Sequence, residues 1–194
     1  MTSTNVAKNK GLPLLAWSVQ APLYDVNNQQ YNYAMTDYKD FKQSHEEFKK
    51  SHRLGIEDRT NENGLLWYAQ DYYNTYVVVS KEIPIKLLTV KLYLLCHSIE
   101  LAIKSWLRRE GYSVKELVKF DHDLVALIHE LIEKFEVKFP KEVVATIALI
   151  NYYYDTKQLE YFDRGSKTFP DLEYLRYCAE LVLHKARTRI NEKN

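Results

Sequence analysis

The stretch Leu92–Leu127 decides the fold, and it reads LYLLCHSIELAIKSWLRREGYSVKELVKFDHDLVAL. Its first half carries apolar residues on nearly every helical face, Gly111 interrupts it, and Asp121-His122-Asp123 precedes a second apolar segment. Glycine commonly ends helices, and aspartate commonly caps their first turn. The stretch therefore predicts two helices that pack against each other in antiparallel directions across a short break.

The same helical spacing of apolar residues continues through most of the chain from Leu65 onward. Five helices are predicted: residues 65–81, a segment from just after Pro84 to Arg109, residues 123–135, a helix opened by Pro140 that carries Tyr152–Tyr154, and a helix opened by Pro170 that reaches Ile190. Short connections between such helices favour antiparallel neighbours. The prediction is an all-α, up-and-down helical bundle of about five helices over residues 65–194.

An N-terminal extension, residues 1–64, precedes this bundle and lacks its periodicity. Proline and asparagine-rich segments predict an irregular chain over residues 1–35, whereas the aromatic and charged residues at 36–52 predict a modest surface helix. The Asn63-Gly64 pair marks the end of the extension. The sequence does not indicate what the extension does.

Composition and charge exclude several classes of protein. The chain of 194 residues has 27 basic and 26 acidic residues, so no overall field attracts nucleic acid or an anionic membrane. Its longest late apolar run, residues 143–150, is shorter than the roughly 20 residues that cross a bilayer. Cys96 and Cys178 lie in apolar helical stretches, which indicates buried free thiols. We expect a soluble cytoplasmic protein.

The predicted second helix is apolar on more faces than one layer of neighbours covers. A second copy of the chain packed against the bundle would bury the remaining faces. On this ground the sequence predicts a symmetric homodimer.

Four segments together resemble the HEPN family of small helical domains of bacteria and archaea. They read CHSIELAIKSWLRREG, FDHDLVALIHEL, INYYYDTKQLEYFDRG and DLEYLRYCAELVLHKA, and the resemblance covers roughly residues 65–190. The positions that match the pattern of the family are Glu100, Leu101, Ala102, Lys104, Gly111, His122, Asp123, Leu124, Leu127, Tyr161 and Arg164. Residues 1–64 have no counterpart in that pattern.

The resemblance implies two kinds of activity. Many members of the family look like dimeric, metal-independent ribonucleases with an Arg followed after four to six residues by a His, whereas others bind nucleotides or serve as partners of nucleotidyltransferases. In this chain the nearest pair is Arg176 and His184, separated by seven residues, which rotates the side chains by about 80° on an α-helix. Arg164 has no His at that spacing. Arg176 and His184 are catalytic candidates only if two chains cross.

His122 and Asp123 form a second candidate site. An imidazole beside a carboxylate at a helix start can bind an anion or act as a base. Alternatively, the two aspartates cap the helix and His122 bonds to the preceding turn. His97 and Glu100 resemble half of a metal motif, but the further carboxylates of a di-iron bundle are missing, so the sequence favours a buried polar pair with no metal or cofactor.

Sixteen tyrosines cluster in the chain, which suggests either a stacking surface for bases or an aromatic interface. A groove between the first and fourth predicted helices would place them near cations. The cations nearby in sequence or pattern are Lys104, Arg108, Arg109, Lys119 and Arg164. Over this groove and the His122–Asp123 site together, the residues predicted to bind a nucleotide or RNA are His122, Asp123, Lys104, Arg108, Arg164 and Tyr161.

The leading hypothesis is a HEPN-like domain that binds nucleotide or RNA without a secure ribonuclease motif, in a defence or toxin–antitoxin context. An active metal-independent endoribonuclease is one alternative, and a non-catalytic protein-interaction module is the other. A nucleotidyltransferase-like protein is a candidate partner.

Overall fold

A computed structural model of the chain describes residues 23–24, 30–31, 42–43, 45–47, 60–83, 86–161 and 166–192. The chain divides into two compact units, Met1–Ser51 and His52–Asn194. In the first unit β1 (Leu23–Tyr24) pairs antiparallel with β2 (Gln30–Tyr31), with Leu23 opposite Tyr31. This short pair comprises the four described residues within the segment 1–35, which the sequence predicts to be irregular. Residues 42–43 and 45–47 are helical, inside the predicted helix at 36–52.

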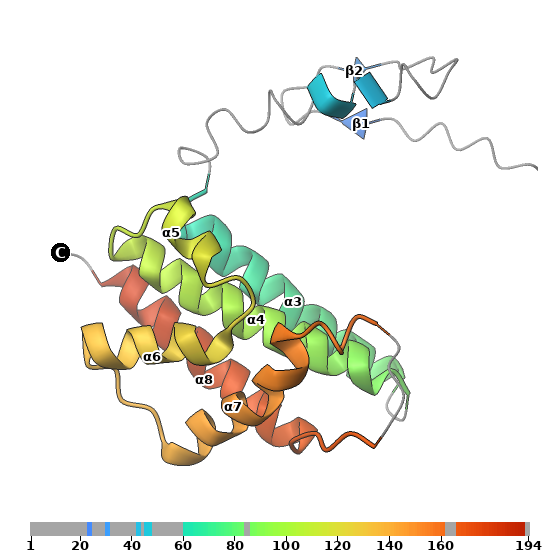
Figure 1. Ribbon diagram of the computed structural model, residues 1–194, viewed down its shortest axis with the longest axis vertical. Coiled ribbons are helices and arrows are strands. Elements are labelled where there is room, and N and C mark those ends of the chain that lie inside the picture. Colours follow the sequence, from blue (N-terminus) through green and yellow to red (C-terminus); the bar gives the residue numbers. More distant parts are fainter. Residues whose placement is uncertain are drawn as a thin grey trace, which may run out of the picture. The chain divides into compact units, whose positions relative to one another are not determined.

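The second unit is an all-α helical bundle, as predicted (Figure 1). Its described helices are α3 (Glu62–Glu82), α4 (Leu88–Arg109), α5 (Val114–Lys119), α6 (Leu124–Phe135), α7 (Lys141–Asp155) and α8 (Leu172–Asn191). No helix of these described segments is both long enough and apolar enough to cross a membrane.

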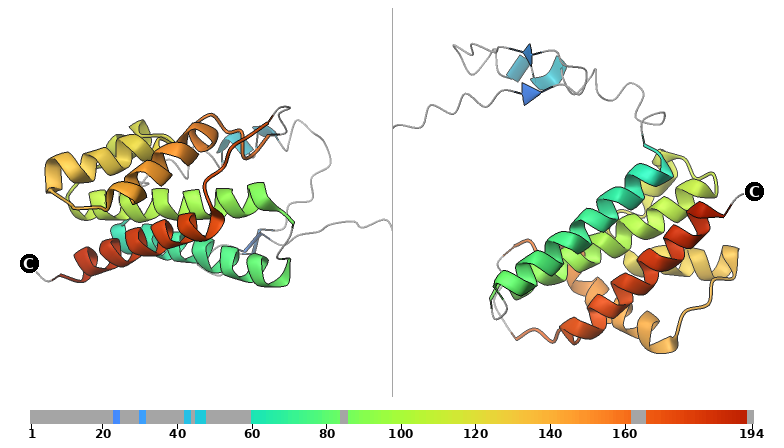
Figure 2. Two further views of the ribbon diagram at one scale, coloured as in Figure 1. Left: turned by 90° about the horizontal axis from the view of Figure 1, so that it is seen from below. Right: turned by 180° about the vertical axis from the view of Figure 1, so that it is seen from behind.

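Helix α4 lies at the centre of the bundle. Figure 2 shows α3 and α8 on one side of it and α6 and α7 on the other. Hydrogen bonds fix the directions. Ser98 of α4 donates to the carbonyl of Ala69 in α3, and Arg108, later in α4, donates to the carbonyl of Thr60 just before α3. Tyr76 of α3 donates to Glu173 near the start of α8, and Tyr73, earlier in α3, donates to Glu180 further along α8. Helix α3 therefore runs antiparallel to both α4 and α8.

The neighbouring helices of the same chain bury α4 on most of its circumference. Its fully buried residues include Leu92, Leu95, Cys96, Ile99, Ala102, Ile103 and Leu107. The predicted homodimer rested on apolar faces of this helix that a second copy would cover. Because its own chain covers them, that argument no longer supports a dimer, which stays a prediction.

Two helix boundaries differ from the prediction for local reasons. Helix α4 begins at Leu88 instead of just after Pro84, because Leu87 has a left-handed backbone with φ of 63°, which a right-handed helix does not contain. The short helix α5 was not predicted at all. Its start carries the Ser-x-x-Glu pattern of a capping box, at Ser113 and Glu116. In the structure the Ser113 hydroxyl accepts from the backbone N–H of Glu116, and the Glu116 carboxylate accepts from the backbone N–H of Ser113.

Candidate functional site

Two regions of the second unit contain most of the chemically notable side chains. The first, here called the Glu100 cluster, consists of His97, Glu100, Lys104, His122 and Tyr154. The second, here called the α4–α8 pocket, has a volume of about 520 Å³. The residues that line it are Trp106, Phe135, Val137, Lys138, His184, Lys185, Thr188, Arg189 and Glu192.

Glu100 is the centre of the Glu100 cluster, and its side chain is 4% exposed. One carboxylate oxygen, Oε1, accepts from the ammonium of Lys104 at 2.6 Å. The other, Oε2, accepts from the Tyr154 hydroxyl at 2.5 Å and lies 3.0 Å from Nδ1 of His122. His97 Nδ1 lies 2.7 Å from the Tyr154 hydroxyl and 3.5 Å from the same Oε2. Side chains from α4, from α7 and from the loop before α6 thus meet at a single buried carboxylate.

The surroundings keep Glu100 ionised despite its burial. Burial alone would raise the pKa of this carboxyl, but its hydrogen bond with His97 and the adjacent Lys104 ammonium hold the pKa well below its ordinary value of 4.5. Burial and the nearby negative charge of Glu100 raise the pKa of the Tyr154 phenol. The carboxylate therefore accepts a hydrogen bond from a neutral hydroxyl.

Aromatic rings enclose the His97 side of the cluster. Tyr72 of α3 meets the imidazole edge to face at a centroid distance of 4.3 Å, and Tyr93 stacks on it at 5.5 Å. Tyr72 of α3 and Tyr154 of α7 thus both contact His97 of α4. The sequence predicts that tyrosines of the first and fourth predicted helices line a shared groove. Tyr154 packs in the interior instead, where it is only 2% exposed.

Several of the predicted binding residues make structural contacts in or beside the Glu100 cluster. Nδ1 of His122 lies 3.0 Å from Glu100 on the central helix, and its Nε2 lies 3.6 Å from the Asp121 carboxylate in the preceding turn. Lys104 donates to Glu100 and to the carbonyl of Asp121, so its charge is already compensated. Asp123 caps α6 by accepting from the backbone of Val125 and Ala126, each at 3.0 Å. The capping alternative for Asp123 is therefore confirmed.

The remaining candidates do not gather at the cluster. Arg108 donates to the carbonyls of Thr60 and Tyr112, which joins the start of α3 to the end of α4. Tyr161 is 69% exposed beyond the end of α7. Arg164 lies outside the described residues.

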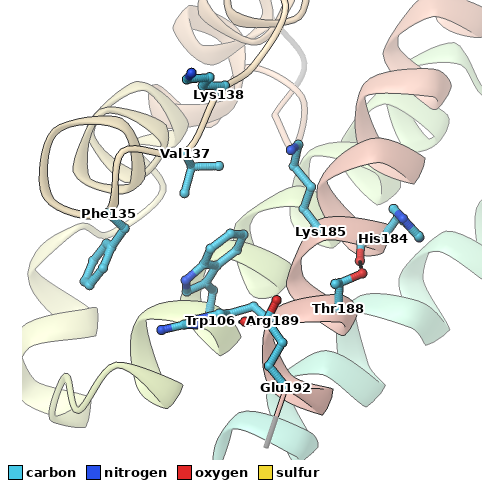
Figure 3. A pocket seen from close by; sticks show the side chains of 9 residues that line it. All are labelled: Trp106, Phe135, Val137, Lys138, His184, Lys185, Thr188, Arg189 and Glu192. Carbon is cyan, nitrogen blue, oxygen red and sulfur yellow. Dashed lines mark hydrogen bonds and ion pairs between the residues drawn. The ribbon is translucent and has the colours of Figure 1, made fainter. Parts of the chain in front are cut away.

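The proposed catalytic pair is separated within one chain. Arg176 lies between the carboxylates of Glu173 and Glu180 on α8 and does not line the pocket. His184 lies two turns further along α8, a rise of about 12 Å. Its imidazole is exposed at the rim of the pocket and points away from Trp106 (Figure 3). A single chain does not place both groups on one phosphate.

The α4–α8 pocket combines the aromatic ring of Trp106 with three cationic side chains, of which only Arg189 is paired with carboxylates among the described residues. Arg189 is paired with Glu110 at 2.5 Å and with Glu192 at 2.8 Å. By contrast, the ammonium groups of Lys138 and Lys185 have no carboxylate within ion-pair distance among the described residues, although Lys185 lies 5.5 Å from the centroid of the Phe139 ring. Figure 3 shows Trp106 and Val137 facing the Lys185 side of this hollow. Its lining carries three cations and one carboxylate, apart from His184.

Sequence reasoning missed most of this pocket. His184 was named for another role, and Trp106, Lys138 and Lys185 were not singled out as a group. The available signal was weak: Lys185 and Arg189 are four residues apart on one helix face, but Lys138 comes from the loop after α6. No family of known proteins, no curated protein and no solved structure matches the chain.

Proposed function

We propose that the bundle binds a nucleotide or a short single-stranded RNA in the α4–α8 pocket and does not cleave it. The observation that carries the proposal is the pair of uncompensated ammonium groups, Lys138 and Lys185, beside the Trp106 ring. The volume of about 520 Å³ falls within the range of roughly 300–1,000 Å³ that small-molecule pockets have. Phosphate oxygens would pair with the ammonium groups.

The aromatic lining gives the second part of the recognition. Bases stack on aromatic side chains at a gain of roughly 1–3 kcal/mol per base, with little dependence on sequence. Trp106 is half-buried and lies on the floor of the pocket, with Phe135 to one side (Figure 3). A base on Trp106 with phosphates directed toward the α8 lysine would use both features at once.

The ion pairs of Arg176 and its distance from His184 favour binding without cleavage over ribonuclease activity. Cleavage without a metal needs a base and a cation within reach of one phosphate. Arg176 is held by two carboxylates, and His184 lies about 12 Å away along α8. An active ribonuclease would require a second chain to bring these groups together, so it remains the alternative.

The wider setting follows from the family resemblance. We infer a HEPN-like domain in a defence or toxin–antitoxin context, as a homodimer or with a nucleotidyltransferase-like partner. What supports the family proposal is the helical order and the central Glu100–Lys104 and His122–Asp123 positions, which fall in one bundle.

The test is fluorescence anisotropy of a labelled single-stranded RNA at low salt, with ATP as competitor. Lys138→Gln combined with Lys185→Gln is expected to weaken binding at least about tenfold and to reduce the salt slope by about 0.7 for each lost phosphate contact. The matched control is Lys81→Gln combined with Lys157→Gln, which removes two exposed charges outside the pocket. Equal losses in both double variants would contradict the proposal.

Cleavage is measured on the same RNA in EDTA. We expect none from the wild-type chain. Cleavage that disappears in His184→Gln would favour the ribonuclease alternative instead.

A protein-interaction module is the second candidate, and an exposed surface of α3 favours it. Trp67 is 78% exposed, Tyr68 64% and Val78 59%. Large apolar side chains at such exposure often mark a binding surface. Absence of any nucleotide or RNA affinity at low salt would make this module the better account.

A further inference from the structure

The Glu100 cluster brings together three metal-ligand side chains from two separate segments. His97 and Glu100 are three residues apart on α4, and His122 comes from the loop before α6. One imidazole nitrogen from each histidine and one carboxylate oxygen of Glu100 all lie within 4.8 Å of one another. Two imidazoles and one carboxylate form a common ligand set for divalent transition metals.

The spacing of these atoms is close to that of a metal site. Zinc bonds to nitrogen and oxygen at about 2.0–2.2 Å, which in a tetrahedral site sets neighbouring ligands about 3.3 Å apart. Glu100 Oε2 lies 3.5 Å from His97 Nδ1 and 3.0 Å from His122 Nδ1. Both distances differ from about 3.3 Å by only a few tenths of an ångström.

Tyr154 supplies a fourth donor atom at the same point. Its hydroxyl oxygen lies 2.5 Å from Glu100 Oε2 and 2.7 Å from His97 Nδ1. Both distances are shorter than the roughly 3.3 Å between neighbouring ligands, so the hydroxyl would have to move away from Oε2 and Nδ1 to complete a tetrahedral set, or leave that corner to a water molecule.

The groups around the donor atoms match the outer shell of a metal site. Metal-bound histidines usually direct their second nitrogen at a carboxylate, and Nε2 of His122 lies 3.6 Å from the Asp121 carboxylate. Lys104 pairs with Oε1 of Glu100, so an ion at Oε2 would keep that ion pair and replace only the contacts that His122 and Tyr154 now make with Oε2. Side-chain exposures of 17% for His97 and 23% for His122 leave a path for an ion to enter.

We propose that His97, Glu100, His122 and Tyr154 form a binding site for one divalent transition-metal ion such as Zn²⁺. The site joins α4 to α7 and to the start of α6. It is independent of the α4–α8 pocket and of any ligand bound there.

The experiment is isothermal titration of the full chain, stripped with a chelator, against ZnCl₂ at pH 7.5. We expect one ion per chain. His122→Gln, His97→Gln and Glu100→Gln should each weaken binding by at least about tenfold, since even changes to an outer shell reach that size. The matched controls are His129→Gln and His184→Gln, which alter exposed histidines outside the cluster and should leave the affinity unchanged.

Cobalt gives a second measurement that needs no variant. Co²⁺ added to the wild-type chain should show the visible absorption of a four-coordinate nitrogen and oxygen site, without the near-ultraviolet bands of thiolate ligands. Loss of this spectrum in His122→Gln would agree with the assignment, and circular dichroism would verify that the variant is folded.

Three results would overturn the proposal. One is the absence of stoichiometric uptake. Another is uptake that the His97 and His122 variants leave intact. The third is thiolate bands with Co²⁺, which would assign binding to Cys96 or Cys178.

Discussion

The Glu100 cluster and the α4–α8 pocket use charged side chains in opposite ways. At the cluster, the carboxylate of Glu100 is 4% exposed and compensated by Lys104, Tyr154 and His122. At the pocket, Lys138 and Lys185 have no carboxylate partner among the described residues and lie beside open space. Compensated buried charges contribute to folding, whereas uncompensated exposed charges are available to a ligand. Substitutions in the two regions should therefore change different properties.

The largest expected effect is on stability, from Glu100→Ala. Removing one partner of a buried ion pair leaves an uncompensated charge, here on Lys104, and costs about 3–5 kcal/mol. The measurement is urea unfolding in EDTA, so that metal binding does not contribute. Glu133→Ala is the matched control, because its exposed pairing with His129 at 3.8 Å contributes little. A loss below about 1 kcal/mol for Glu100→Ala would contradict the central role of this carboxylate.

Low pH should remove part of the contribution that Glu100 makes to the free energy of unfolding. Because the pKa of Glu100 is lower in the folded chain than its ordinary value of 4.5, its contribution to stability is present above pH 4.5. It is lost as the pH falls below that value toward the folded-state pKa. Glu100→Gln cannot titrate, so the stability curves of wild type and variant should converge between pH 5 and the acid limit. Parallel curves over that range would show that Glu100 does not carry this dependence.

Tyr154→Phe should cost less, about 1–2 kcal/mol. The variant keeps the buried ring but removes the hydroxyl that donates to Glu100 at 2.5 Å. Tyr152→Phe, on the same helix but 62% exposed, is the control and should change the unfolding free energy by less than about 0.5 kcal/mol. Equal effects in thermal or urea unfolding would mean that the Tyr154 hydroxyl is not a specific partner of Glu100.

Most of the bundle could be predicted because its signals are local. The apolar stripe of α3 and the aspartate caps of α6 and α8 each lie within a few residues of the element they define. The capping box of α5 was equally local but was not used. The start of α4 depends on the left-handed conformation of Leu87, a residue that does not favour it, so local propensity gives no warning.

The two sites were harder to predict because they combine distant segments. The sequence indicated the His97–Glu100 pair, whose residues share a helix face, but His122 and Tyr154 reach the carboxylate only after α6 and α7 pack on α4. In the pocket, Trp106 and Lys185 are brought together by the parallel course of α4 and α8, which Arg189 and Glu110 fix at their ends. Arg176 and His184 share one helix, yet helical geometry alone separates them.

The smallest expected effect on stability comes from Lys138→Gln combined with Lys185→Gln. Neither ammonium is paired with a carboxylate among the described residues, so their removal should change the unfolding free energy by less than about 0.5 kcal/mol. The same variant should lose at least about tenfold in RNA affinity, whereas Tyr154→Phe should lose stability and keep that affinity. Urea unfolding and anisotropy on both variants therefore test the division directly. If the lysine variant lost both stability and RNA affinity, Lys138 and Lys185 would contribute to folding. The loss of affinity could then not be assigned to lost contacts with a ligand.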